Sequence, residues 1–207
     1  RRFKKIYGEK AIYSFEQKFD WLTSSPLKAI HSAVWDEICE VYALLIEDKF
    51  SLDSKIQEVR KFENQRIDIY FFEPYNFIFE FDERQHFNKY RLLTLAYSQK
   101  YACFDFNEYQ ELCHKYDSKP NKSGFSTLRH CDPLFPPLLD SEAQDNRTRQ
   151  RAFRDFLKDI LPPLFGLHPT VRISFEKANK KKTDFNDTDI RQIIDYINQR
   201  KFIANLL

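Results

Sequence analysis

The chain contains no methionine, three glycines and four cysteines among its 207 residues. Because an initiator methionine is absent, we expect the natural N-terminus to lie upstream of Arg1. The cysteines follow no regular short spacing, which favours reduced intracellular thiols over a disulfide framework and predicts a cytoplasmic protein. No Walker loop, dinucleotide-binding fingerprint or nucleophile elbow occurs.

Long apolar runs are also missing. None approaches the roughly 20 residues that a membrane-spanning helix needs, so we expect no membrane-embedded segment and no membrane partner. The opening Arg1-Arg2-Phe3-Lys4-Lys5 lacks the apolar core of a signal peptide. The net charge of +2 is small, but a nucleic-acid enzyme needs only a basic docking face, so the net charge excludes nothing.

What the chain does contain is apolar volume. Hydrophobic residues make up 42% of it, with 21 Phe and 11 Tyr, which is enough for a buried core. We expect one domain over residues 1–207, with its core over about 27–100 and 145–203. The segment 117–144 is rich in Pro, Ser and Asn, which predicts a long loop or an inserted lobe.

Hydrophobic periodicity and turn signals predict an α/β or mixed α+β domain. Helices are expected over residues 14–22, 27–47, 88–97, 107–116, 145–161 and 188–203. Strands are expected over residues 55–60, 67–72, 77–82 and 170–175. Pro162-Pro163 should end the fifth of these helices, and residues 177–182 should form a basic loop.

The two clearest strands, residues 67–72 and 77–82, predict a β-hairpin. Pro74-Tyr75-Asn76 suits a three-residue loop, because Pro fits the second turn position and Asn tolerates the left-handed conformation. Side chains alternate along a strand, so Glu80 and Asp82 share a face. A three-residue loop would pair Glu73 with Phe77, and would set Asp68 opposite Asp82 and Tyr70 opposite Glu80. Three carboxylates would then converge on one patch.

Such a patch has two interpretations. Clustered carboxylates repel one another unless a cation neutralises them, and oxygen ligands favour Mg²⁺ or Mn²⁺, which activate water in phosphodiester cleavage. His86 could then shuttle a proton, and Gln85 could orient water or a phosphate. The same spacing also suits a solvated hairpin face, on which acidic residues alternate with core residues.

The hairpin resembles the PD-(D/E)XK nuclease superfamily, which includes restriction and repair endonucleases. Asp68 matches the family's first Asp and Glu80 its Glu, whereas Asp82 stands where the family has Lys. The stretch Glu80-Phe81-Asp82-Glu83-Arg84-Gln85-His86 resembles the Glu-x-Asp-Gly-x-x-His variant of very-short-patch repair endonuclease relatives, with Glu83 in place of Gly. The resemblance covers residues of about 27–97.

This resemblance implies a restriction-endonuclease-like core, with a central mixed β-sheet flanked by helices. It implies a Mg²⁺-dependent endonuclease that hydrolyses double-stranded DNA, with Mn²⁺ as a substitute, in a restriction or repair setting. Asp68, Glu80 and Asp82 would hold the metal, and His86 with Gln85 would assist proton transfer. By analogy the enzyme would act as a homodimer. The alternatives are an inactive nucleic-acid-binding or protein-interaction module, and an RNA nuclease or junction resolvase.

Other residues give weaker signals. The resemblance implies a further catalytic Glu on the preceding helix, for which Glu37 is the candidate. Arg147, Arg149, Arg151 and Arg154 could grip phosphates at a helix start, or form a solvated face paired with Asp155 and Asp159. Lys180, Lys181 and Lys182 could contact nucleic acid from a loop. A structural zinc site is also conceivable at Cys113, His114, His130 and Cys131, although the usual two-residue spacer is missing.

Overall fold

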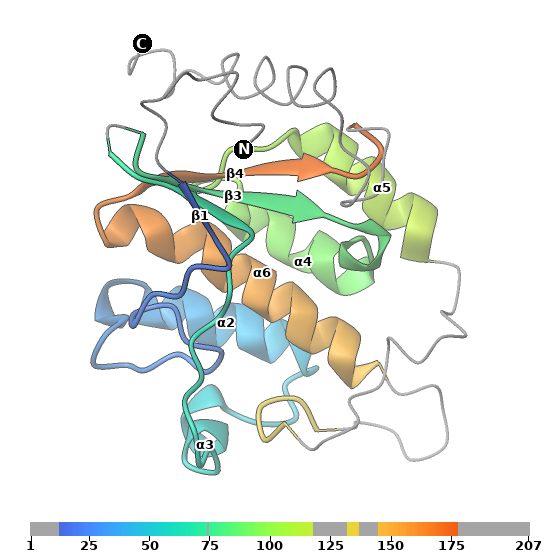
Figure 1. Cartoon of the computed structure of the whole chain (residues 1–207). Coiled ribbons are helices and arrows are strands. Elements are labelled where there is room, and N and C mark those ends of the chain that lie inside the picture. The colour runs from blue at the N-terminus through green and yellow to red at the C-terminus, as the bar shows by residue number, and fades with distance from the viewer. Residues whose placement is uncertain (1–12, 74, 118–131, 137–144, 178–207) are drawn as a thin grey trace.

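A computed structural model describes residues 13–73, 75–117, 132–136 and 145–177. These residues form a mixed α+β fold, as the sequence predicts (Figure 1). The helices are α2 (Trp35–Leu45), α3 (Leu52–Ile56), α4 (Lys89–Ser98), α5 (Phe106–Asp117) and α6 (Asn146–Leu164), with short 3-10 turns η1 (Ser32–Val34) and η2 (Arg84–His86). Within these segments, every helix is too short or too polar to cross a lipid bilayer.

The sheet has four strands in the order β1 (Tyr13–Phe15), β2 (Ile69–Phe71), β3 (Phe77–Asp82) and β4 (His168–Ser174). β1 and β2 pair antiparallel, as do β2 and β3, whereas β3 and β4 run parallel. A parallel neighbour requires a crossover connection, and α4, α5 and α6 lie in the chain between these two strands. The mixed sheet is therefore a hairpin extended by one crossover unit.

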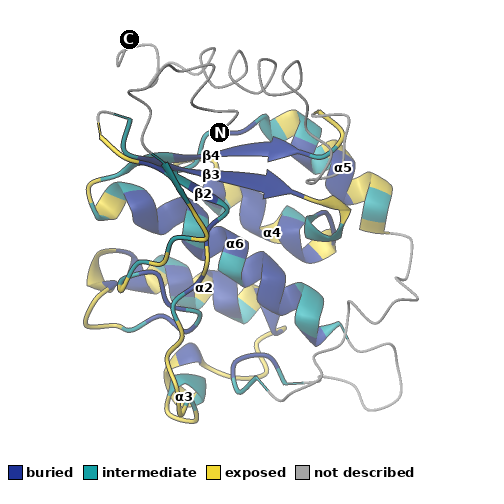
Figure 2. Cartoon of the chain, viewed as in Figure 1, coloured by how far each residue is buried: buried dark blue, intermediate teal, exposed yellow. Residues whose placement is uncertain are grey.

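Helix α6 lies between the sheet and α2 (Figure 1). It is buried along most of its length, as are β3 and β4 (Figure 2). Its apolar side chains Phe153, Phe156 and Ile160 join the main core with Ile38 and Tyr42 of α2. The sheet face that contains Phe79 and Phe81 forms a separate apolar cluster, so the other face of β3 must be the one that meets α6.

The prolines expected to stop α6 lie inside its last turn. Pro162 has no N–H to bond the carbonyl of Lys158 four residues earlier. The Thr170 hydroxyl of β4 donates to that carbonyl instead, at 2.7 Å. The chain then turns at Gly166, where φ is +80° and glycine is favoured. This turn ties the end of α6 to the start of β4 and fixes the position of Lys158.

Two predicted elements are wrong. Residues 14–22 are not helical, because Tyr13–Phe15 pairs with β2 as an edge strand and tertiary pairing overrides the local pattern. Residues 55–60 are not a strand, because the Ser51 hydroxyl caps α3 by accepting from the Ser54 N–H. The helix expected over residues 27–47 begins only at Trp35, after a 3-10 turn. The helix expected over residues 188–203 lies outside the described residues.

Candidate active site

The hairpin has a different register from the predicted one. Ile69 pairs with Phe79 and Phe71 with Phe77, so the loop spans residues 72–76 and Asp68 lies opposite Glu80 rather than Asp82. Asn76 takes the expected left-handed conformation, with φ of +45°. The prediction was wrong by two residues because the loop contains five residues rather than three. A two-residue shift preserves the side-chain faces, so the carboxylates stay on the predicted side.

Asp68 and Glu80 are locked together by reciprocal hydrogen bonds. The Asp68 N–H donates to Glu80 Oε1 at 3.0 Å, and the Phe81 N–H donates to Asp68 Oδ2 at 2.9 Å. Each carboxylate is therefore held by the backbone of the opposite strand.

A third side chain, Lys158 of α6, completes this group. Its ammonium lies 2.8 Å from Glu80 Oε2. Glu80 is only 3% exposed, and burial raises its pKa, with Lys158 acting in the opposite direction and Asp68 adding to the rise. This part of the hairpin therefore brings two carboxylates and one ammonium together.

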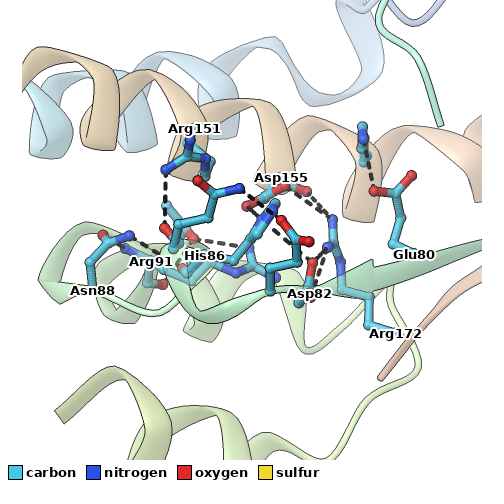
Figure 3. A network of polar contacts seen from close by, with 12 residues as sticks. Glu80, Asp82, His86, Asn88, Arg91, Arg151, Asp155 and Arg172 are labelled. Atoms are coloured by element: carbon cyan, nitrogen blue, oxygen red, sulfur yellow. Dashed lines mark hydrogen bonds and ion pairs between the residues drawn. The ribbon is translucent and has the colours of Figure 1, made fainter. Parts of the chain in front are cut away.

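The interpretation of this strand face as solvated is wrong. Glu80 is 3% exposed and Asp82 1% exposed, because the face packs against α6. Figure 3 shows Glu80 set apart from a second group of side chains around Asp82. The strand therefore presents two separate buried carboxylates, each with its own partners.

Asp82 belongs to an ion-pair network. Its two oxygens accept from Arg172 Nη1 at 2.7 and 3.0 Å, and Oδ2 also accepts from the Tyr109 hydroxyl at 2.8 Å. Arg172, from β4, also bonds Asp159 of α6, and Asp159 pairs with Arg91 of α4 at 2.8 Å. The network thus joins β3, β4, α4 and α6 in the interior (Figure 3).

His86 links this network to the surface. Its Nδ1 lies 2.8 Å from Asp155 Oδ2 and 3.5 Å from Asp82 Oδ1. Burial lowers the pKa of His86, but the Asp155 and Asp82 carboxylates outweigh burial and hold that pKa above its ordinary value. Burial likewise opposes ionisation of Asp155, yet His86 and Arg172 leave its pKa well below its ordinary value.

Asp82, His86 and Asp155 lie close enough together to hold a metal ion. However, the carboxylates of Asp82, Asp155 and Asp159 are balanced by three cations: Arg91, Arg172 and protonated His86. A metal ion would have to displace Arg172 from both Asp82 oxygens. The charge balance therefore favours a structural network here.

The raised pKa of His86 predicts a pH-dependent stability. A raised folded pKa gives stabilisation that is complete below the unfolded value of about 6.5 and is lost as pH rises through the folded value. The melting-temperature advantage of the wild type over His86→Gln should therefore be largest near pH 5.5 and shrink toward pH 9. Thermal denaturation followed by circular dichroism across this range measures it.

His31 provides the matched control. Its Nδ1 accepts from the Leu27 N–H at 3.0 Å, and its Nε2 lies 2.8 Å from the Trp21 carbonyl, an arrangement that suits the neutral ring. Burial lowers the pKa of His31, so the advantage of the wild type over His31→Gln should instead grow as pH rises toward about 6.5. The same slope for both variants would contradict our assignment of the charged form to His86.

A basic cleft of about 780 Å³ opens beside these groups. Its lining contains seven basic side chains and two acidic ones, which makes it suited to an anionic ligand. The basic residues are Lys18, Lys61, Arg66, Arg147, Arg151, Arg154 and Lys158. Gln85, His86 and Asp155 also line it, so the cleft reaches Lys158, the partner of Glu80, and the exposed edge of the ion network.

The remaining predicted residues are placed as follows. Glu37 accepts from the Tyr101 hydroxyl and pairs with Lys100, neither of which lines the cleft. Arg149 is buried and pairs with Asp145, away from the cleft that Arg147 and Arg151 line. Gln85 bonds Glu83 through its side chain. Lys180, Lys181 and Lys182 lie outside the described residues.

The zinc hypothesis finds little support at the positions that the structure describes. Cys113 is buried and His114 is exposed, so these neighbours point away from each other on α5. Burial raises the pKa of Cys113 to about 12, which opposes the thiolate that zinc needs. His130 and Cys131 lie outside the described residues.

The sequence analysis missed Lys158, Arg172 and Arg91. A signal existed for Arg172, because a lone Arg between Val171 and Ile173 in a strand must find buried anions on one face. Asp155 and Asp159 are four residues apart on α6 and supply those anions. The expected solvated pairing of these two Asp residues with neighbouring Arg side chains is therefore wrong.

Comparison with protein-family models gives one match. The model described as "Family of unknown function (DUF7255)" matches residues 50–187, more than half of the chain. This range contains Asp68, Glu80 and Lys158, together with the ion network around Arg172. Searches of curated proteins and of solved structures found no match.

Proposed function

The chain belongs to DUF7255, a family of unknown function, and from its own site we propose that it is a Mg²⁺-dependent endonuclease that hydrolyses DNA phosphodiester bonds. One observation carries the proposal. Asp68 and Glu80 are fixed opposite each other, with Lys158 on Glu80, beside a cleft of predominantly basic side chains. Asp68 and Glu80 are two of the three metal ligands that the resemblance to PD-(D/E)XK nucleases implies, and Lys158 adds the residue type that the motif lacks at position 82.

The residues fit a magnesium ion. Mg²⁺ is commonly bound through one or two carboxylates, with water and substrate phosphate completing its shell. Asp68 and Glu80 would supply these carboxylates. When bound, the ion would acidify a water molecule and neutralise charge on the phosphate.

The chain's own residues supply the rest of the chemistry. Lys158 would take the place of the lysine that the motif lacks at position 82. It approaches Glu80 from α6 rather than from β3. It would orient the attacking water and stabilise negative charge on the phosphate. His86 lines the cleft in a form that favours protonation, and it could donate a proton to the leaving oxygen.

The test is cleavage of circular DNA, single-stranded and duplex, by the purified chain. We expect cutting of at least one circle in Mg²⁺ or Mn²⁺ and none in EDTA. Circles rather than linear fragments are needed, because only an internal cut opens them. Cutting that persists in EDTA, or no cutting of either circle, would overturn the proposal, and the second result would favour a binding module.

Lys158→Gln tests the assignment of the displaced lysine. Loss of one preorganised charge-stabilising donor typically costs about 10²–10³-fold in turnover, so we expect a decrease of this size at saturating DNA. Because Lys158 also lowers the pKa of Glu80, the pH profile of the residual activity should move to higher pH. Single-turnover cleavage across pH 6–9 measures both effects.

Arg154→Gln is the matched control, since it removes one charge from the same helix face without touching Glu80. It should weaken DNA binding while leaving saturated turnover and the pH profile near those of the wild type. Equal effects of the two variants would contradict the catalytic role of Lys158 and would leave it as a phosphate-binding cation like Arg154.

A further inference from the structure

The basic side chains of α6 form a single stripe. Arg147, Arg151, Arg154 and Lys158 follow the spacing i, i+4, i+7 and i+11, which is one face of a helix, and all four line the cleft. At a rise of about 1.5 Å per residue, the stripe is about 16 Å long. It ends at Lys158, which contacts Glu80 of the candidate metal pair.

These cations are poorly compensated by the protein. Among the described residues, Arg147 and Arg151 have no carboxylate within ion-pair distance, and Arg154 has only Asp132 at 3.9 Å. Burial and the neighbouring Arg147 lower the pKa of Arg151 to about 10. Arg154 Nε is buried without a hydrogen-bond partner in the described part of the chain. Partly buried, mutually repelling guanidinium groups require an external anion.

The facing wall of the cleft is of another kind. It is formed by residues 61–66, and its basic members are already neutralised: Lys61 pairs with Glu63 at 3.0 Å and Arg66 with Glu16 at 3.4 Å. Phe62 on this wall is 38% exposed, and it is the aromatic side chain, besides His86, that lines the cleft. An exposed aromatic ring offers a surface on which a nucleobase can stack.

We propose that the cleft binds one unpaired strand of nucleic acid, with successive phosphates along the α6 stripe and a base on Phe62. That the polyanion is a nucleic acid rests on the proposed function. The inference then narrows the substrate of that function from duplex to unpaired DNA. The strand would run toward Lys158, and so toward the Asp68–Glu80 pair.

The different side chains on the two walls of the cleft favour a single strand over a duplex. A strand with exposed bases presents phosphates on one side and rings on the other, which matches a cationic wall and a second wall that carries one exposed aromatic ring. A duplex hides its base faces in the stack and presents phosphates on both strands.

The test is fluorescence anisotropy with a labelled oligo-dT, an oligo-U and a duplex of equal length, in EDTA so that no cleavage occurs. We expect the single strands to bind at least about tenfold more tightly than the duplex. Four phosphate contacts predict a log–log salt slope of about −3 for a single strand. Arg151→Gln and Arg154→Gln should each flatten this slope by about 0.7, whereas Lys100→Gln, exposed and outside the cleft, should not.

Phe62 supplies the second pair of variants. Phe62→Ala should weaken single-strand binding by about tenfold, because stacking on the ring is lost, and Phe62→Tyr should retain it. Duplex binding as tight as single-strand binding, with no effect of Phe62→Ala, would overturn the proposal. Binding of poly-glutamate in preference to either oligonucleotide would overturn it in favour of an acidic protein partner.

The two proposals can fail separately. Tight single-strand binding without Mg²⁺-dependent cutting would support single-strand binding along the α6 stripe and contradict the nuclease activity. Cutting of duplex circles without single-strand binding would support the nuclease activity and contradict the proposed role of the α6 stripe. A preference for either oligo-dT or oligo-U over the duplex would support single-strand binding along the α6 stripe. The preferred oligonucleotide would show whether the site favours deoxyribose or ribose.

Discussion

Replacing Arg172 by Met should destabilise the protein by about 3–5 kcal/mol, because it leaves buried carboxylates without their shared partner. Arg172 bonds both oxygens of Asp82 and one of Asp159, and it lies 3.7 Å from Asp155. All of these side chains are buried. Urea denaturation followed by circular dichroism measures the loss, as a lower midpoint at constant slope.

Two further variants make this result interpretable. Arg66→Met removes an exposed ion pair with Glu16 and should cost less than about 1 kcal/mol. Arg91→Met removes the pairing with Asp159 alone and should fall between the two, which covers the case that the Arg172 variant does not fold. A cost for Arg91→Met no larger than that of Arg66→Met would contradict the view that this network stabilises the fold.

Glu80→Gln and Asp68→Asn should each lower DNA cleavage by at least about 10³-fold. Each variant removes one carboxylate of the proposed metal pair, and a metal's stabilisation of the transition state is worth several kcal/mol. Both amides keep an oxygen to accept the interstrand hydrogen bonds from the Asp68 and Phe81 N–H groups. The melting temperature of Asp68→Asn should therefore stay within about 4 °C of the wild type, a shift that corresponds to about 1 kcal/mol. Glu80→Gln also breaks the ion pair with Lys158, so it should lose more.

Glu73→Gln is the control for these two variants, because Glu73 is an exposed acidic residue on the same hairpin. It should cut like the wild type. A large loss of melting temperature in Glu80→Gln and Asp68→Asn, with cleavage falling only in proportion, would instead assign the pair a structural role.

The hairpin illustrates what the sequence could predict. Alternation along β3 correctly placed Glu80 and Asp82 on the face opposite Phe79 and Phe81, since that depends only on the pleat. The cross-strand partner of Asp68 depends on loop length, and the turn signal around Asn76 fits loops of three and of five residues. What decides the register is contact outside the hairpin, such as the bond from the Asn76 side chain to the Gly166 carbonyl.

Helix α6 illustrates what the sequence could not predict. Its start and its mixture of charged and apolar residues were evident, but it lies between the sheet and α2, so it packs on both sides and its remaining face lines the cleft. Lys158 meets Glu80 and Asp159 meets Arg172 across separations of 78 and 13 residues. Such pairings follow from the crossover between β3 and β4, and no local pattern encodes them.

The most direct test of the account is a crystal structure with Mn²⁺, in which anomalous scattering locates the ion. The account predicts a peak bounded by the carboxylates of Asp68 and Glu80, with the Arg172–Asp82 pairing unchanged. That peak should disappear in Glu80→Gln crystals grown in the same way. A peak among Asp82, His86 and Asp155, with Arg172 displaced, would contradict the account, because it would move the metal centre into the network that we assign to stability.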